Sequence, residues 1–198
     1  MPREVELKAV VEDVDACRRR LSAAGAHVTF EGRLEDRRYD SPDHRLRDAD
    51  QMLRVRSFSD GNGPQGALEW KGPTRYEHGY KVREEISAGT RDAASIASIL
   101  ERLGYAVTLE IDRDVVQYVL GDATIRFERY PSMDVLVEVE GAPDAIDRAI
   151  EALGMPRAAF SADRLATFMA RFEARTGRRA IVSERQAADA AGDDIANG

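Results

Sequence analysis

Hydrophobic and charged residues alternate along much of this chain with a period of two, the pattern of a β-strand whose two faces meet different surroundings. Such runs recur over residues 3–11, 27–40, 52–59, 66–72, 79–88, 106–120, 123–130 and 134–140. Apolar residues at helical spacing predict helices over 13–24, 91–103, 143–153 and 161–175. The first three of these helices end at a glycine suited to a left-handed cap. The pattern therefore predicts an α+β fold with about eight strands.

The charged positions of these strands hold mostly Arg, Lys and Glu, whereas the exposed face of a surface strand usually also carries Thr, Ser and Gln. In the first strand, Glu4, Glu6 and Lys8 share one face, and apolar residues take the other. The same division continues in Arg54 and Arg56, Glu69 and Lys71, Lys81, Arg83 and Glu85, Arg126 and Glu128, and Glu138 and Glu140. For one strand alone, the simplest interpretation is that the charges face water.

A barrel closed from these strands would bring the charged faces together inside, with the apolar faces packed outward against the helices. A membrane barrel shares the polar interior, but its strands are not interrupted by helices, so we set it aside. Because unpaired charges are costly away from water, such an interior needs pairing, hydration or a charged ligand. Carboxylates without His or Cys suit Mg²⁺ or Mn²⁺, and Arg and Lys suit phosphate oxygens. The pattern therefore predicts a site for a metal-bound polyphosphate.

Composition narrows the class of protein. The 198 residues carry a net charge of -7 with a pI near 5.1, which argues against a general nucleic-acid surface. The single cysteine excludes an internal disulfide. Since the sequence contains no long apolar run or signal-like segment, we expect a cytoplasmic protein without a membrane partner. One domain is expected over 1–175, followed by a mobile tail over 176–198 that has too few apolar residues to pack.

A weak repeat at an offset of 79 residues relates the two halves of the chain. Identical residues recur at this offset in Glu6 and Glu85, Leu21 and Leu100, Gly25 and Gly104, Val28 and Val107, Thr29 and Thr108, Glu31 and Glu110, and Tyr39 and Tyr118. The repeat predicts two strand-helix-strand halves about a pseudo-twofold axis, with a shorter third copy over 138–154.

Short charged motifs occur in a fixed order along the chain. They are ExExK as Glu4, Glu6 and Lys8, then EDRRYD, LRVR, LEWKGP, KVREE and a closing EVE. In this order they resemble the CYTH superfamily of triphosphate tunnel metalloenzymes over residues 1–172, and the form of LRVR and LEWKGP is most similar to the class IV adenylyl cyclase branch. The resemblance implies a closed eight-stranded antiparallel β-barrel with helices outside. It also implies a tunnel that holds a small-molecule triphosphate, such as ATP or tripolyphosphate, and an interface between two barrels in a homodimer.

The resemblance further implies roles for the charged residues. The expected ligands of Mg²⁺ or Mn²⁺ are Glu4, Glu6, Glu128, Glu138 and Glu140. The expected contacts to the substrate are Lys8, Arg54, Arg56, Lys71, Lys81, Arg83, Arg113 and Arg126. The expected catalytic set is Glu4, Glu6, Lys8 and Arg113.

Three positions depart from the family pattern. Ile111 stands where a Lys of the sixth strand is usual, and Ser87 replaces the last carboxylate of an Arg-x-Glu-x-Glu motif. Glu128 stands in place of the usual Asp of the seventh strand. For Asp36 and Asp40 in EDRRYD, the sequence leaves two roles open, one at the tunnel mouth and an ordinary one at a strand edge.

Three functions are compatible with this pattern. The first is a class IV adenylate cyclase, in which the ribose 3′-hydroxyl attacks the metal-polarised α-phosphate of ATP to give cAMP and pyrophosphate. The alternative is a triphosphatase that hydrolyses inorganic tripolyphosphate, thiamine triphosphate or a nucleotide triphosphate. The third is a binder without turnover, which the departures at Ile111 and Ser87 motivate. A base pocket would distinguish the first two, but the sequence does not identify its residues.

Overall fold

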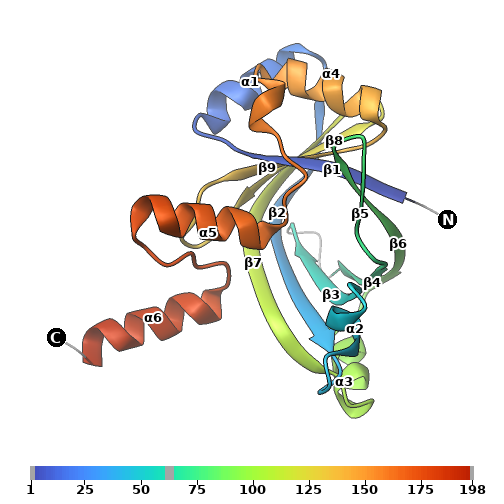
Figure 1. Cartoon of the computed structure of the whole chain (residues 1–198), viewed down its shortest axis with the longest axis vertical. Coiled ribbons are helices and arrows are strands. Elements are labelled where there is room, and N and C mark those ends of the chain that lie inside the picture. The colour runs from blue at the N-terminus through green and yellow to red at the C-terminus, as the bar shows by residue number, and fades with distance from the viewer. Residues whose placement is uncertain (1–2, 61–64, 197–198) are drawn as a thin grey trace.

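The computed structural model describes residues 3–60 and 65–196, which form a β-barrel with helices on its outside (Figure 1). Its strands are β1 (Arg3–Val10), β2 (His27–Asp40), β3 (Met52–Ser59), β4 (Gln65–Lys71), β5 (Arg75–Glu77), β6 (Tyr80–Thr90), β7 (Ala106–Leu120), β8 (Ala123–Arg129) and β9 (Leu136–Glu140). Eight strands pair in the antiparallel order β1-β9-β8-β7-β2-β3-β4-β6, and β6 pairs back to β1. The predicted closed eight-stranded barrel is therefore confirmed, and the short β5 pairs with β6 as an additional strand.

The register between strands brings charged residues together inside the barrel. β1 pairs with β6 so that Glu6 lies opposite Lys81, and it pairs with β9 so that Lys8 lies opposite Glu138. Residues directly opposite each other on paired strands point to the same face. A slip by one residue would turn the whole charged set outward, so the register determines the polar interior.

The repeat corresponds to equivalent elements of the fold. Helices α1 (Val14–Ala23) and α3 (Ala93–Arg102) are related by the offset of the repeat, as are β2 and β7. β1 pairs with β6 and β2 pairs with β7, both in antiparallel fashion, as expected for two halves about a pseudo-twofold axis. Gly25 and Gly104 follow the two helices with φ values of 89° and 88°, a left-handed conformation that favours glycine.

The apolar faces of the strands pack outward beneath helices. α1 and α4 (Pro143–Leu153) cover the outer face of β1, β8 and β9, at the top of Figure 1. The hydrophobic cluster between these helices and the strands includes Leu7, Leu21, Ile125, Val139 and Ile146, each at most 1% exposed. α3 covers β3 and β4 in the same way. Because the helices remove the apolar outer faces from water, the inner faces are free to carry charge. Within 3–60 and 65–196, no helix is long and apolar enough to cross a membrane.

Three short elements have no counterpart in the sequence pattern. They are α2 (Arg45–Asp48), β5 and a 3₁₀ helix (Arg157–Ala159). Each is too short to show a hydrophobic period, which explains why the pattern does not predict them.

The chain after α5 (Leu165–Thr176) differs from the expected mobile tail over 176–198. Ala180 and Val182 are buried, and Ile181 exchanges two backbone hydrogen bonds with Ser132 at 3.1 and 2.9 Å. Helix α6 (Glu184–Ala196) follows. The low overall apolar content of this segment predicts mobility. Three consecutive apolar residues nevertheless pack here, because Val182 joins a hydrophobic cluster with Leu136 and Phe168 while Ile181 pairs with Ser132.

Candidate functional site

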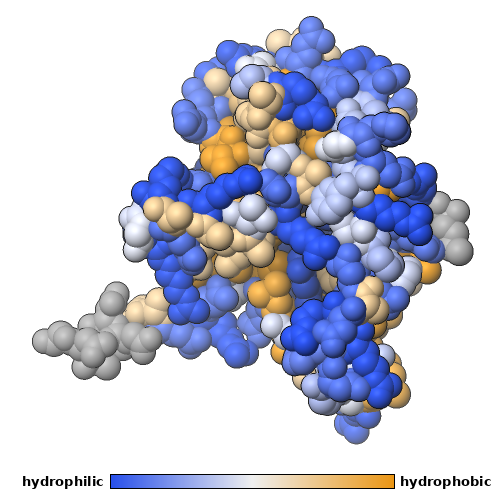
Figure 2. Space-filling view, in the orientation of Figure 1, coloured by the Kyte–Doolittle hydropathy of each residue, from blue (hydrophilic) through white to orange (hydrophobic). Residues whose placement is uncertain are grey.

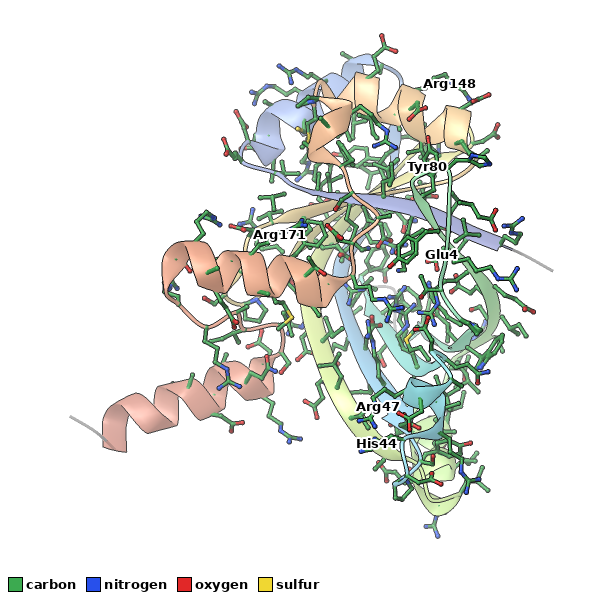
Figure 3. All side chains as sticks on the ribbon, in the orientation of Figure 1. Glu4, His44, Arg47, Tyr80, Arg148 and Arg171 are labelled. Carbon is green, nitrogen blue, oxygen red and sulfur yellow. The ribbon has the colours of Figure 1, made fainter. Side chains whose placement is uncertain are left out.

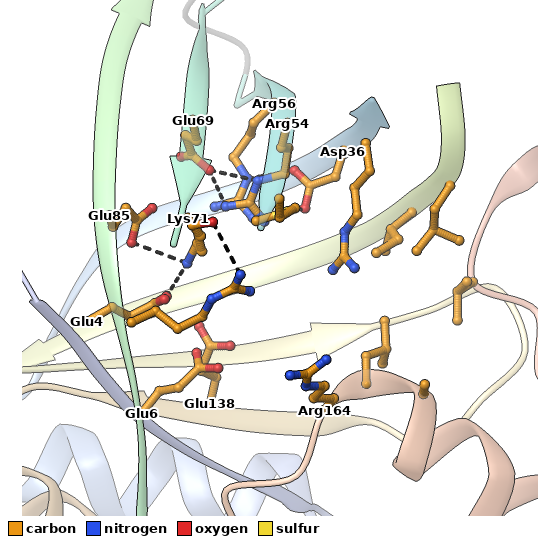
Figure 4. A pocket seen from close by; sticks show the side chains of 18 of the residues that line it. Glu4, Glu6, Asp36, Arg54, Arg56, Glu69, Lys71, Glu85, Glu138 and Arg164 are labelled. Atoms are coloured by element: carbon orange, nitrogen blue, oxygen red, sulfur yellow. Dashed lines mark hydrogen bonds and ion pairs between the residues drawn. The ribbon is translucent and has the colours of Figure 1, made fainter. Parts of the chain in front are cut away.

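The interior of the barrel is a cavity of about 860 Å³, lined by side chains from all eight barrel strands and from the start of α5 (Figure 4). Every residue that the sequence predicts for the site lines it, namely Glu4, Glu6, Lys8, Arg54, Arg56, Lys71, Lys81, Arg83, Arg113, Arg126, Glu128, Glu138 and Glu140. Figure 3 shows Glu4 within the barrel, whereas Arg148 lies outside it on α4. His44 and Arg47 lie at the opening beside α2 (Figure 3). The structure therefore brings the whole predicted set to one cavity.

Lysines and glutamates from different strands pair on one side of the cavity. The pairs are Lys8 with Glu138, Lys71 with Glu4, and Lys81 with Glu6. Lys71 also lies 3.2 Å from Glu85. Burial raises the pKa of Glu6, but the lysines around it outweigh burial, and the pKa is lowered. In the free protein, these lysines and glutamates therefore neutralise each other.

Asp36 lies at the centre of an arginine cluster in the same cavity. Its carboxylate accepts hydrogen bonds from Arg56 at 2.7 and 2.9 Å. Arg54 and Arg113 each donate to it at 3.0 Å. The Asp36 side chain is 1% exposed, and burial raises its pKa, yet the three guanidinium groups lower it well below its usual value. Asp36 therefore lies deep inside rather than at the mouth or a strand edge, and its alternation with Arg38 in EDRRYD is the signal for that position.

Asp40 has a structural role. It accepts hydrogen bonds from the backbone N–H groups of Ser41 at 2.8 Å and of Leu46 and Arg47 at 3.0 Å. These bonds cap the short helix α2. Burial raises the pKa of Asp40, but the three backbone donors outweigh burial and lower it. Asp40 therefore holds α2 at the end of β2, and it also lines the cavity beside the opening.

Glu128, which the sequence predicts as a metal ligand, already has protein donors on both oxygens. Arg113 donates from Nε at 2.8 Å, and the Tyr130 hydroxyl donates to the other oxygen at 2.8 Å. Burial raises the pKa of Glu128, but Arg113 and then Lys8 outweigh burial and lower it to about 2. Glu128 is therefore ionised, and its direction is fixed by its two donors.

The loss of a carboxylate at Ser87 has a counterpart on the neighbouring strand. Ser87 is the cross-strand partner of Glu69 on β4. Glu69 accepts a hydrogen bond from Arg54 Nε at 2.7 Å and is 6% exposed. A buried carboxylate therefore lies beside the place where the family motif would put one. The sequence places Glu69 on the charged face of its strand, but it does not show that Arg54 donates to Glu69.

Arg83 and Arg164 organise the opening of the cavity. Arg83 donates to the backbone carbonyls of Gly72 at 2.6 Å and of Asp50 at 2.9 Å. Arg164, which precedes α5, donates to the Asp50 carboxylate at 2.9 and 3.0 Å and to the Thr74 hydroxyl at 3.0 Å. Figure 4 shows Arg164 across the cavity from the arginine cluster. The sequence does not predict Arg164 for the site, because it belongs to a helical segment far from the charged strands.

Some charged groups in the cavity have no partner within the described ranges. Arg38 forms no ion pair there, and its buried Nε has no hydrogen-bond partner. Burial, and then the nearby Arg54, lower the pKa of Arg38 to about 10. Oε2 of Glu4 is likewise buried without a donor. Glu140 has no hydrogen-bond donor or ion-pair partner in that part of the chain, and burial, then the like charge of Glu4, raise its pKa. Arg38, one oxygen of Glu4 and the carboxyl group of Glu140 therefore have no direct partner in the described part of the chain.

The glutamate side of the cavity fits a hard divalent cation. Its donors are carboxylate oxygens without His or Cys, the set that Mg²⁺ and Mn²⁺ prefer. Oε2 of Glu4 is buried without a hydrogen-bond donor and Glu140 has no ion-pair partner in the described ranges, so carboxylate oxygens remain available for a ligand here. Across 3–60 and 65–196, no three such side chains already converge as a ligand set. Lysines hold Glu4, Glu6 and Glu138, so a cation would bind them only when the lysines turn to another anion.

The chain matches one family model, and its fold is similar to that of several solved structures. The family model described as CYTH domain matches residues 2–145. None of the curated proteins matches the chain. A structure from Vibrio parahaemolyticus, assigned as an adenylate cyclase, has 20% identity and a TM-score of 0.71, over 84% of this chain and 97% of that chain.

Two further solved structures are similar. The PH1819 protein of Pyrococcus horikoshii has 23% identity and a TM-score of 0.65, over 82% of this chain and 96% of that chain. A Hippeastrum protein, assigned as an adenylyl cyclase and described with a dominant triphosphatase activity, has 14% identity and a TM-score of 0.60, over 86% of this chain and 96% of that chain. At these identities the likeness shows the fold alone.

Proposed function

We propose that this chain, which belongs to the CYTH domain family, converts ATP to cAMP and pyrophosphate as a class IV adenylate cyclase. The enzymes of this family act on triphosphates and generally depend on a divalent metal. The match confirms the resemblance carried by the motifs. The proposal rests on groups of the cavity that lack direct partners among the described residues, since Arg38 and Glu140 form no ion pair there and Oε2 of Glu4 accepts no hydrogen bond. A metal-bound triphosphate supplies both charges in one ligand. The form of LRVR and LEWKGP supports the cyclase rather than the hydrolase.

Substrate binding would exchange the partners of the lysines. In the free protein, Lys8, Lys71 and Lys81 are each held by a glutamate. With a triphosphate bound, the lysines would turn to phosphate oxygens, and their glutamates would then be available to hold the metal. Because these lysines and glutamates would each exchange one partner for another, the exchange would avoid the cost of leaving them bare in a buried site.

The arginines need less rearrangement than the lysines. Asp36 already fixes the guanidinium groups of Arg54, Arg56 and Arg113 in one region of the cavity. Donors that are held in place before the substrate arrives stabilise developing charge without the cost of reorganisation. We therefore assign these arginines, together with Arg126, to the phosphate oxygens and to the charge of the leaving pyrophosphate.

The chemistry follows from positioning and electrostatics. A divalent ion held by these glutamates would supply polarisation of the α-phosphate and a lower pKa of the ribose 3′-hydroxyl. The proposed ligands are Glu4, Glu6, Glu128, Glu138 and Glu140. The chain itself holds the phosphates in line and neutralises their charge, so no protein nucleophile is required.

Hydrolysis is the second candidate. It is supported by the similarity to the Hippeastrum protein that is described with a dominant triphosphatase activity. The same cavity would serve both reactions, because the outcome depends on which phosphorus atom faces the nucleophile. The substrate of a hydrolase would be inorganic tripolyphosphate, thiamine triphosphate or a nucleotide triphosphate.

³¹P NMR of the protein incubated separately with ATP and with tripolyphosphate tests the proposal, with Mg²⁺ and Mn²⁺ in parallel. Pyrophosphate and cAMP from ATP, without orthophosphate, would establish the cyclase. Orthophosphate that forms faster from tripolyphosphate would establish the hydrolase instead. Binding of both compounds without any product would leave a triphosphate binder and overturn both reactions.

A further inference from the structure

Tyr130 places a hydroxyl group beside the carboxylate of Glu128 inside the barrel. Tyr130 is 6% exposed and lines the cavity, and its hydroxyl donates a hydrogen bond to Oε2 of Glu128 at 2.8 Å. It follows β8 directly, and residues two apart on an extended chain point to the same face. The alternation of charged residues does not reveal Tyr130, because a tyrosine carries no charge there.

The side chain of Glu128 needs to be held in place before it can serve as a ligand. Glu128 stands where the family pattern has an aspartate, and its additional methylene group gives it more rotamer freedom to lose on binding. Two donors remove this freedom, because Arg113 Nε holds one oxygen and Tyr130 holds the other, both at 2.8 Å. Arg113 also donates to Asp36 at 3.0 Å. Tyr130 therefore ends a hydrogen-bonded chain that reaches the centre of the arginine cluster.

A hydrophobic cluster holds the ring of Tyr130. The other buried members of this cluster are each at most 5% exposed, and they are Ile111 from β7, Leu136 from β9, Phe168 from α5 and Val182 from the segment before α6. Figure 2 shows hydrophobic side chains gathered beside α5 on a face that is otherwise mostly hydrophilic. Because packing on this scale leaves little room for another rotamer, the hydroxyl of Tyr130 stays directed at Glu128.

The backbone after Tyr130 is held by the segment before α6. Ser132 exchanges its two backbone hydrogen bonds with Ile181, and the Arg178 guanidinium donates to the Ser132 hydroxyl at 3.1 Å. Both α5 and this segment lie outside residues 2–145, the part that matches the family model. The support of Tyr130 therefore depends on a part of the chain that the family match does not cover.

We propose that Tyr130 is a positioning residue for the divalent metal, because its hydroxyl group holds Glu128 in the direction in which the carboxylate binds the cation. The inference rests on the proposed function, since it takes Glu128 as a metal ligand. Each carboxylate oxygen accepts more than one contact, so a cation can bind Glu128 while Arg113 and Tyr130 still donate to it. A donor behind a ligand orients that ligand and tunes its affinity for the metal.

Isothermal titration calorimetry with an analogue of tripolyphosphate tests the inference, in EDTA and in Mn²⁺. Methylene groups replace the bridging oxygens of the analogue, so that it cannot be hydrolysed. The variant is Tyr130→Phe, which keeps the ring in its cluster and removes only the hydroxyl group. Loss of a residue that orients a ligand lowers metal affinity by about 10–100-fold, so binding in Mn²⁺ should weaken about 10-fold. Binding in EDTA should stay within about twofold, because Asp36 still holds the arginines.

Tyr118→Phe is the matched control. Tyr118 is 3% exposed in the hydrophobic cluster beneath α1 and α4, and its hydroxyl accepts a hydrogen bond from Arg18 Nε at 2.9 Å. This variant also removes one hydrogen bond of a buried tyrosine, so a purely structural effect on Tm should be similar in both variants. Only Tyr130→Phe should change the effect of Mn²⁺ on binding.

A double variant shows whether Tyr130 acts through Glu128. If it does, adding Tyr130→Phe to Glu128→Gln should not weaken binding in Mn²⁺ any further, and a further loss would overturn the inference. Thermal melting establishes that each variant is folded, and Tyr130→Met replaces Tyr130→Phe if the latter does not fold.

The remaining outcomes separate the inference from the proposed function. A Tyr130 variant that weakens binding equally in EDTA and in Mn²⁺, or in neither solution, would overturn the inference while the proposed function stands. Wild-type protein that does not bind the analogue, or whose binding is not strengthened by Mn²⁺, would overturn the proposed function and the inference together.

Discussion

Glu6 and Glu140 lie directly opposite each other on β1 and β9, and both side chains line the cavity. Like charges in this relationship repel each other. The protein does not relieve the repulsion equally. Burial raises the pKa of both groups, but Lys8 and then Lys81 outweigh burial and lower the pKa of Glu6, whereas Glu4 adds to burial and raises the pKa of Glu140. One carboxylate is therefore firmly ionised beside another that is easier to protonate. A divalent cation bound to both would remove the repulsion.

Replacing Glu6 by Gln should abolish metal-dependent turnover. The change removes a proposed metal ligand but keeps the shape of the side chain. Replacing a residue that only orients a metal ligand lowers metal affinity or activity by about 10–100-fold. Because Glu6 is itself a proposed ligand, we expect kcat to fall by at least about 100-fold. Product formation from ATP with Mn²⁺ measures it. The matched control is Glu84→Gln on β6, next to Arg83 but facing away from the cavity. Full activity of Glu6→Gln would remove Glu6 from the site.

Glu140→Gln should stabilise the metal-free protein at neutral pH. A carboxyl group whose pKa is raised by folding contributes stability below its unfolded pKa of about 4.3, and this stability is lost as the pH rises through the folded pKa. Gln reproduces the protonated form at every pH. We therefore expect the variant to have a higher Tm than wild type at about pH 7.5 and an equal Tm at about pH 4. For a protein of this size, each 1 kcal/mol of added stability raises the Tm by about 2–4 °C.

The same variant should respond less to metal. Mn²⁺ should raise the Tm of the wild-type protein more than that of Glu140→Gln, because the amide is a poorer ligand than the carboxylate. Melting curves in EDTA and in Mn²⁺, at both pH values, separate the two effects. A Tm below that of wild type at neutral pH in EDTA would show that Glu140 has a stabilising partner in the free protein.

Asp36→Asn should destabilise the protein strongly. The variant leaves Arg54, Arg56 and Arg113 close together without their shared carboxylate. Loss of one partner from a buried ion cluster costs about 3–5 kcal/mol, which corresponds to a fall in Tm of about 10 °C. Tripolyphosphate should restore part of the loss, because it supplies negative charge to the same guanidinium groups. Thermal melting with and without tripolyphosphate measures both effects.

A carboxylate on the outside of the barrel provides the control for Asp36. The side chain of Asp114 on β7 is 68% exposed and lies 3.6 Å from Arg33. Exposed pairs of this kind contribute about 0–1 kcal/mol, so Asp114→Asn should melt close to wild type. If Asp36→Asn melted like Asp114→Asn, the arginine cluster would not depend on Asp36.

Arg38→Met should separate stability from binding. In the free protein Arg38 is a cation without an ion-pair partner in the described ranges, so its removal should leave the Tm unchanged or raise it. The affinity for tripolyphosphate should fall about 10-fold, because a hydrogen bond to a charged group contributes about 1.5–3 kcal/mol. Calorimetry and melting curves measure the two effects, with Arg102→Met on the surface of α3 as the control. A large fall in Tm would indicate that Arg38 has a structural role.

The strands and their charged interior are predictable from the sequence because alternation is a local property. Glu4, Glu6 and Lys8 show it within five residues, and closure of the barrel then determines which way they point. The pairing of these charges is not local. Asp36 and Arg113 meet across 77 positions of the chain, and the pattern of either strand alone does not contain that contact.

The hydrophobic side chains that line the cavity beside α5 are not predictable from the sequence for a different reason; they are Leu109, Ile111, Leu165, Met169 and Val182. They come from β7, α5 and the segment before α6, and each contributes only one or two side chains. The sequence indicates only that Ile111 replaces a phosphate contact, whereas the structure shows that Ile111 and Val182 belong to one hydrophobic cluster. Sequence periods identify the face of a single element, whereas this surface exists only where three elements meet.

β1 closes the barrel along both of its edges, through β6 on one side and β9 on the other. During synthesis on the ribosome, β1 emerges before every other barrel strand, yet its second partner follows only at Leu136–Glu140. Until then the sheet is open, with an unpaired edge of the kind that promotes association between nascent chains. We expect the acidic and basic side chains of the interior to stay hydrated during this interval, because burying unpaired charge is costly, and premature collapse of the sheet onto itself is then unfavourable. The same charges that would bind the substrate would thus also protect the chain while it is being made.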